Sequence, residues 1–151
     1  MILVSSCLAG VKCRYNGTAS LNGKIQELVD DKKAMLVCPE LLGGFLTPRE
    51  PAEIIGGYGI DVLEGRAKVI EKSGKDVTEL YINGALRTLE LVNLNKVSCV
   101  VLKENSPSCG SKMIYDGSFQ NKKIAGDGVT SALLKREGIK VISEEELSEL
   151  W

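Results

Sequence analysis

Cysteine is the residue type of this chain most suited to chemistry, because three cysteines follow apolar, strand-like runs. Cys7, Cys38 and Cys109 each stand just after such a run, directly or after a short loop. In an open parallel sheet, the loops at the carboxyl ends of the strands surround the ligand crevice. We therefore expect three thiols that are far apart in the sequence to meet at one edge of a sheet. Convergent thiolates suit a metal ion or an iron–sulfur cluster better than a packed core.

The rest of the composition excludes several kinds of catalytic and metal site. The chain has five cysteines and no histidine, which excludes Ser-His-Asp and Cys-His catalysis and imidazole metal ligands. The amino terminus lacks the features of a secretory signal, and no apolar run is long enough for a membrane span. We therefore expect a cytoplasmic protein with no membrane partner. The cytosol keeps thiols reduced, so metal binding or catalysis is the natural use of these cysteines.

Length and charge favour one globular domain acting on a small molecule. The 151 residues are 44% hydrophobic and 26% charged, with a net charge of −1, and we predict a single domain over residues 1–151. No cluster of Lys or Arg stands out, so the sequence has no broad basic surface for a nucleic acid.

Apolar runs alternate with helical patterns along the chain. Strands are predicted at residues 2–6, 34–37, 97–102, 113–115 and 140–142. Helices are predicted after Asn22, from a capping box of Asp76 and Glu79 to about residue 95, and after a second capping box of Ser143 and Glu146. Another helix is predicted at 128–137, begun by Asp127 and stopped by Gly138. The breaker-rich stretch at 39–52 is predicted to be an irregular, functional loop.

Residues 53–71 are predicted to form short strands in a hairpin-like excursion, at 54–55, 60–63 and 67–70. The alternation of strands and helices elsewhere predicts right-handed crossovers between parallel strands. The expected fold is therefore α/β: a single domain with a mostly parallel sheet and helices on both faces, a Rossmann-like three-layer sandwich.

Four segments combine cysteine, carboxylate, hydroxyl and turn residues: 7–17, 38–49, 102–110 and 115–117. Together with Gly126-Asp127-Gly128-Val129-Thr130, they resemble the thiouracil desulfidase family, in the same order and through nearly the whole chain.

The resemblance implies a catalytic [4Fe–4S] cluster held by Cys7, Cys38 and Cys109, with one iron open to the substrate. That iron would polarise the carbon–sulfur bond of a thiolated pyrimidine for attack by water, releasing hydrosulfide without net redox change. The resemblance also gives Glu40 the role of general base or proton shuttle, and Ser106 a hydrogen bond to the substrate or the water. We expect such a cluster to be oxygen-sensitive, so purification in air can leave the site empty or filled by zinc.

Four further residues are weaker candidates for binding the substrate: Arg14, Tyr15, Arg49 and Ser108. The arginines serve equally well as surface charges that brace loops, and the tyrosine as a packing residue. The substrate is a free base, a nucleoside or a thiolated position in RNA, and the near-neutral charge favours a small molecule over RNA. The oligomeric state is not indicated.

Two alternatives use the same cysteines differently. Cys13 as a fourth thiolate would make a closed zinc site, and the protein would be a non-catalytic, zinc-stabilised α/β binding module. The chain lacks the C-x₂₋₄-C pair typical of such sites. The other alternative is an enzyme with a single reactive thiol, which the absence of histidine disfavours. Cys99, inside an apolar run, is expected to be a small core residue.

Overall fold

A four-stranded parallel sheet forms the base of the molecule. In this computed structural model the described residues are 1–6, 23–45, 50–104 and 106–146. The sheet has the strand order β2-β1-β5-β8, and all its pairings are parallel. Its strands are β1 (Ile2–Ser5), β2 (Ala34–Val37), β5 (Cys99–Leu102) and β8 (Lys140–Ser143).

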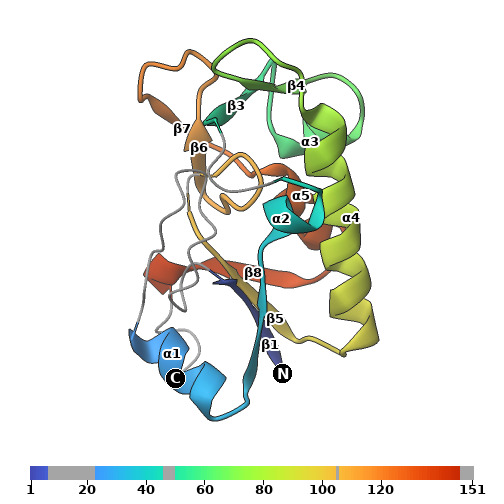
Figure 1. The fold of residues 1–151 in the computed structure, drawn as a ribbon, viewed down its shortest axis with the longest axis vertical. Coiled ribbons are helices and arrows are strands. Elements are labelled where there is room, and N and C mark those ends of the chain that lie inside the picture. Colours follow the sequence, from blue (N-terminus) through green and yellow to red (C-terminus); the bar gives the residue numbers. More distant parts are fainter. Residues whose placement is uncertain (7–22, 46–49, 105, 147–151) are drawn as a thin grey trace.

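Helices cover both faces of this sheet (Figure 1), so the expected α/β class with three layers is confirmed. One face packs against α1 (Gly23–Asp30) through Ile25, which lies with Val4 and Val101. Side chains of the opposite face pack against α4 (Thr78–Leu94) and α5 (Val129–Arg136). The alternation of side chains along a strand produces these two apolar faces from continuous apolar runs.

A second core lies beyond the carboxyl edge of the sheet, at the top of Figure 1. It is built from two antiparallel hairpins and a short helix, and α4 and α5 contribute to both cores. The hairpins pair β3 (Ala52–Ile55) with β4 (Lys68–Glu71), and β6 (Met113–Tyr115) with β7 (Lys123–Ala125); the helix is α3 (Gly59–Leu63). The sequence predicted the first hairpin and β6 but missed β7.

The prediction of a strand at 60–63 was wrong, because these residues form α3. Asp61 accepts a hydrogen bond from the backbone N–H of Tyr58 at 2.8 Å, which caps a helical turn. Arg66 then binds Asp61 at 2.9 Å, and these bonds lower the pKa of the Asp61 carboxyl, the Tyr58 N–H first and Arg66 second. Such local side-chain bonds decide the conformation of short apolar runs whose periodicity fits both helix and strand.

Three other predictions need correction. The loop at 39–52 contains a short helix, α2 (Pro39–Leu42), and its last residue opens β3. The helix α4 begins at Thr78 without the predicted capping box; Asp76 instead accepts the Thr78 N–H and hydroxyl, at 2.9 and 2.6 Å. The helix α5 begins after Gly128, and Asp127 pairs with Lys135 instead of capping it.

Half of the predicted capping box at the end of the chain is present in the described residues, because Glu146 binds the Ser143 N–H while the Ser143 hydroxyl binds the neighbouring residue, Glu145. The N–H of Ser143 donates to Glu146 at 3.1 Å, and the N–H of Glu145 donates to the Ser143 hydroxyl at 3.2 Å. The helix predicted beyond it lies outside the described residues, as does Asn22.

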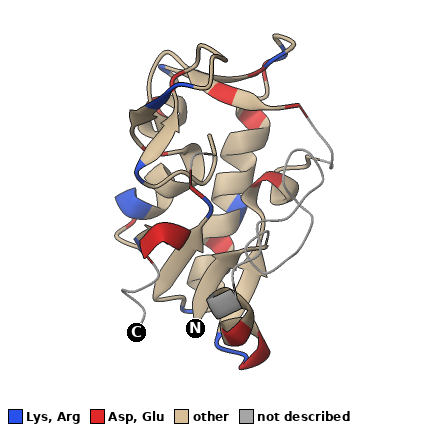
Figure 2. Ribbon diagram, turned by 90° about the vertical axis from the view of Figure 1, so that its left-hand side faces the viewer, with Lys and Arg blue, Asp and Glu red and all other residues tan. Residues whose placement is uncertain are grey.

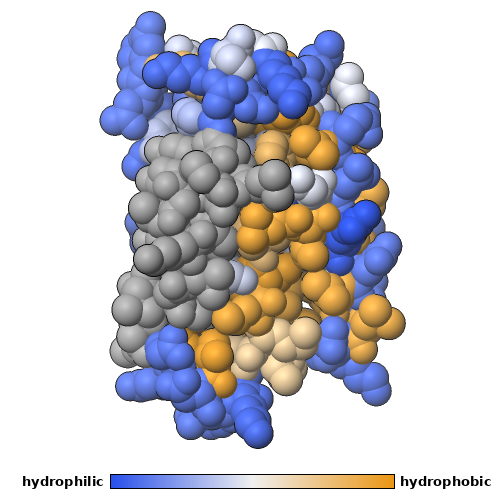
Figure 3. Space-filling view, viewed as in Figure 1, coloured by the Kyte–Doolittle hydropathy of each residue, from blue (hydrophilic) through white to orange (hydrophobic). Residues whose placement is uncertain are grey.

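Acidic and basic residues are interspersed over the described surface (Figure 2), in line with the net charge of −1. An apolar area lies over β2, α2 and α4 (Figure 3), where Leu36, Leu41 and Leu86 are exposed. Within the described part of the chain, no helix combines the length and apolar character needed to cross a membrane.

We expect the substitution Asp76→Ala to lower the free energy of unfolding by about 1 kcal/mol near neutral pH, because the first turn of α4 loses its side-chain acceptor. The hydroxyl of Thr78, and then its N–H, lower the pKa of Asp76 below the ordinary value of 3.8. A carboxyl with a lowered pKa stabilises the fold above its unfolded-state pKa, and this contribution disappears as the pH falls through the folded-state pKa. Because the Asp76 side chain is 49% exposed, solvent screening reduces the charged part of the effect.

The difference between wild type and variant should therefore narrow below about pH 4. Urea unfolding from pH 7 downward measures it, with Asp31→Ala, at an exposed turn, as the control. A difference that stays constant with pH would contradict the role of the Asp76 charge.

Candidate active site

Two of the predicted ligand cysteines stand at the carboxyl ends of parallel strands. Cys38 directly follows β2, and Cys109 lies in the loop that follows β5. The strand β1 runs between β2 and β5 and pairs with both. The residue after β1, Ser6, is the last described residue before the gap at 7–22, and it directly precedes Cys7 in the sequence. Because β1, β2 and β5 are parallel, their carboxyl ends lie at the same edge of the sheet.

The short helix α2 begins right after Cys38 because Pro39, at its first position, has the fixed φ that a helix start needs. It packs against α4 through two glycines. A Cβ on Gly43 would stand 2.1 Å from the carbonyl oxygen of Leu80, and a Cβ on Gly84 would stand 2.1 Å from the carbonyl oxygen of Pro39. Only glycines allow this approach of the two backbones, which places Glu40 above α4.

The loop that carries Cys109 is attached to the first turn of α5. The N–H groups of Gly128, Val129 and Thr130 donate to the carbonyls of Gly110, Pro107 and Ser108, at 2.8, 2.7 and 2.9 Å. In addition, the Ser131 hydroxyl donates to the Cys109 carbonyl at 2.9 Å. The first N–H groups of a helix have no partner within it, and here the cysteine loop supplies the acceptors.

The hydroxyl of Ser106 connects the two cysteine loops. It donates to Oε1 of Glu40 at 3.0 Å, and its oxygen accepts the backbone N–H groups of Ser108 and Cys109, at 3.0 and 3.2 Å. The second carboxylate oxygen of Glu40 accepts the phenol of Tyr81, on α4, at 3.3 Å. Both oxygens of the Glu40 carboxylate are thus oriented by protein groups, one from each neighbouring segment.

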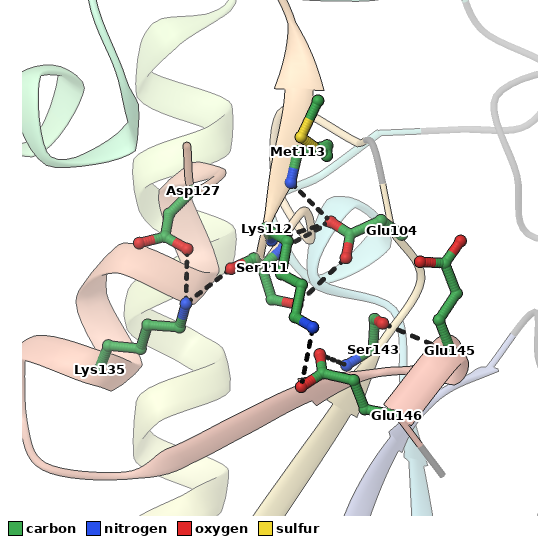
Figure 4. Close-up of polar contacts among 9 residues, drawn as sticks. All are labelled: Glu104, Ser111, Lys112, Met113, Asp127, Lys135, Ser143, Glu145 and Glu146. Carbon is green, nitrogen blue, oxygen red and sulfur yellow. Dashed lines mark hydrogen bonds and ion pairs between the residues drawn. The ribbon is translucent and has the colours of Figure 1, made fainter. Parts of the chain in front are cut away.

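A buried carboxylate, Glu104, fixes the far side of the same loop (Figure 4). It is 4% exposed and accepts three consecutive backbone N–H groups, those of Ser111, Lys112 and Met113, at 2.8, 3.1 and 3.2 Å. The ammonium of Lys135, on α5, donates to the carbonyl of Ser111 and to Asp127, both at 2.7 Å. These charge-assisted bonds stiffen the return of the loop into β6.

The structure brings together four of the predicted site residues: Cys38, Glu40, Ser106 and Cys109. Ser108 is 1% exposed, and its hydroxyl is 2.8 Å from that of Thr130 on α5. The other predicted residues, Cys7, Arg14, Tyr15 and Arg49, lie outside the described residues, as does Cys13.

Sequence reasoning missed Tyr81, because it reaches the site from a helix distant in sequence, and it named Thr130 only as part of the segment at 126–130, without a role. The sequence signal that was available is Gly84, a glycine inside a helical pattern, which often marks a close packing contact.

The motif at 115–117 forms a turn beside β3. Asp116 accepts the hydroxyl and the N–H of Ser118, at 2.6 and 2.9 Å, and these bonds lower the pKa of its carboxyl, the hydroxyl most. The buried Glu53 accepts the N–H of Gly117 at 2.9 Å. This motif therefore has a structural use in closing the β6–β7 hairpin onto the second core.

The donor set fits a thiolate-bound cluster in its chemistry. Cys38 is partly exposed and Cys109 is 5% exposed. Outside the gaps at 7–22, 46–49, 105 and 147–151, no group of three or more His, Cys, Asp or Glu side chains could hold a metal ion. A three-thiolate site therefore needs a ligand from the undescribed residues, and Cys7 stands at the start of the first gap. Cys99, by contrast, is 6% exposed and packs in the core under α1, as expected from the sequence.

Comparison with known proteins gives consistent results. Residues 2–146 match the family described as 2-thiouracil desulfurase. The uncharacterized protein YbbK of Bacillus subtilis strain 168 is 63% identical over 150 residues, covering 99% of both chains. A solved structure, that of a [4Fe-4S]-dependent thiouracil desulfidase, TudS, is 41% identical and superimposes with a TM-score of 0.88, covering 99% of this chain and 93% of that one.

We expect the substitution Gly84→Ala to destabilise the protein by about 1–3 kcal/mol, because overpacking forces backbone to move. The new methyl would meet the Pro39 carbonyl and displace α2. In an ordinary helix position the same change would be stabilising by propensity. Asn83→Ala, at the exposed neighbouring position, is the matched control and should cost little. Denaturant unfolding measures both, and a Gly84→Ala protein as stable as wild type would contradict the packing of α2 on α4.

Proposed function

Because the chain belongs to the 2-thiouracil desulfurase family, we propose that it is an enzyme that removes sulfur from a thiolated pyrimidine with the help of a [4Fe–4S] cluster. The reaction exchanges the thiocarbonyl sulfur for oxygen from water, releases hydrosulfide and involves no net redox change. The observation that carries this proposal is the Ser106 hydroxyl, which joins Glu40 to the loop of Cys109. This hydroxyl connects a carboxylate, two residues after Cys38, to the backbone of the loop that carries Cys109. The likeness to a [4Fe-4S]-dependent thiouracil desulfidase supports it.

The cluster ligands are Cys7, Cys38 and Cys109. This assignment is supported by the order of the strands, since β1 lies between β2 and β5 and Cys7 follows its end. These three thiolates would hold the cluster, which when bound would supply a soft Lewis acid that polarises a carbon–sulfur bond.

Glu40 receives the proton of the attacking water. The oxygen of that water forms the new bond to the ring carbon, the carbon–sulfur bond breaks, and sulfur leaves as hydrosulfide. A general base must be oriented toward the proton that it accepts, and the Ser106 hydroxyl binds Oε1 of the Glu40 carboxylate at 3.0 Å. Ser106, whose hydroxyl binds Glu40 and accepts two N–H groups, keeps this carboxylate aligned with the Cys109 loop.

Arg14, Tyr15 and Arg49 contact the substrate in this proposal, and the buried Ser108 acts by shaping the loop against Thr130. The substrate is a free base or nucleoside in preference to thiolated RNA, since the chain has a net charge of only −1. We place the enzyme in the cytoplasm, whose reducing conditions keep thiolates available, and assign the activity to one domain spanning residues 1–151.

The iron and sulfide content of cysteine variants tests which cysteines bind the cluster and which belong to the core. After strictly anaerobic reconstitution, the wild-type protein should hold about four iron and four acid-labile sulfide per chain. Cys38→Ser and Cys109→Ser should lose both, whereas Cys99→Ser, in the core, should keep them. Equal loss in all three variants would contradict the assignment, and one zinc without sulfide would identify a zinc-stabilised binding module instead.

Hydrosulfide release from 2- and 4-thiouracil tests the role of Glu40. The variant Glu40→Ala should keep its iron and sulfide but lose about 10²- to 10⁴-fold in kcat, the usual contribution of a general base. Glu90→Ala, at an exposed position of α4, should retain wild-type turnover. A Glu40→Ala protein that is fully active would remove Glu40 from the mechanism.

A further inference from the structure

Tyr81 is a buried phenol that the proposed chemistry does not yet use. It is 3% exposed, on the first half of α4, with its ring packed edge-on against Phe45 at 5.0 Å between centroids. Its hydroxyl lies 3.3 Å from Oε2 of Glu40 and donates to it. A tyrosine side chain has only two torsion angles that place its ring. When packing fixes the ring, the position of the hydroxyl oxygen is fixed as well.

Among the described residues, the carboxylate of Glu40 accepts hydrogen bonds from Ser106 and Tyr81, which belong to different segments. Ser106 belongs to the same loop as Cys109, whose backbone N–H it accepts. Tyr81 belongs to α4, which also fixes α2 through the contact of Gly84 with Pro39. The phenol therefore fixes the orientation of the Glu40 carboxylate relative to α4. The loop that carries Cys109 takes no part in this contact.

We propose that Tyr81 is a positioning residue of this site, whose phenol selects the orientation in which Glu40 presents its carboxylate to the attacking water. This inference rests on the proposed desulfuration. Tyr81 touches neither substrate nor water; it acts through Oε2 of Glu40. Removing the phenol takes away the hydrogen bond to Oε2 of Glu40, so we expect fewer enzyme molecules to hold the carboxylate in the productive orientation.

The substitution Tyr81→Phe keeps the ring and its contact with Phe45 and removes only the hydroxyl. We expect kcat to fall about tenfold, the equivalent of one hydrogen bond to a charged group, while KM and the iron and sulfide content stay at wild-type values. Tyr58→Phe, at a phenol on an exposed side chain, is the matched control and should retain full turnover.

The double variant Tyr81→Phe with Glu40→Asp tests whether the phenol acts through Glu40. The shorter aspartate draws the carboxylate back from the phenol, so removing the hydroxyl in that background should cause no further loss. Losses that multiply would overturn the proposal, as would a Tyr81→Phe enzyme with wild-type kcat. Loss of iron in Tyr81→Phe would overturn it too, by assigning the phenol to holding the cysteine loop. A wild-type protein with a full cluster and no hydrosulfide release would instead refute the proposed function, and this inference with it.

Discussion

The first turn of α5 needs hydrogen-bond acceptors for its N–H groups, and the loop that carries Cys109 supplies them. Carbonyls from residues 107–110 take the place of a side-chain cap, and the Ser131 hydroxyl adds a bond in the same direction. Gly128 makes the contact possible, because a Cβ there would stand 2.6 Å from the Ser108 carbonyl. The helix and the loop therefore satisfy each other, and neither has its observed form without the other.

The helix α4 connects α5 and the Cys109 loop to α2, the helix that begins directly after Cys38. Its second turn meets α2 backbone to backbone at Gly84, and Tyr81 reaches Glu40 from the same turn. Because α4 packs in both cores, the position of α2 is set by the bulk of the protein. The Ser106–Glu40 bond then closes a ring of contacts that runs from α5 through the Cys109 loop and α2 to α4. Every member of that ring is held by at least two others, as a preorganised site requires.

The strands and the cysteines were predictable because their signals are local. The apolar run at 34–37 is β2 to the residue, and the run at 97–102 contains β5, so the places of Cys38 and Cys109 after their strands followed from the sequence alone. The helix at 60–63 was missed because an acidic cap, Asp61, decided between two periodicities. Tyr81 was missed for a different reason. Its bond to Glu40 spans 41 positions, and no local pattern in one sequence reports such a pairing.

The bonds that hold the Cys109 loop affect the binding free energy of any ligand at this loop. They join protein groups to protein groups: N–H to carbonyl, hydroxyl to carboxylate, and N–H to the buried Glu104. The conformational entropy of the loop is thus lost when the chain folds, and a ligand does not have to compensate for it on binding. In a zinc finger the metal must order the chain, and the metal-free chain is unfolded. In the described residues, by contrast, the Cys109 loop is ordered by bonds between protein groups, so the cost of ordering it falls on folding.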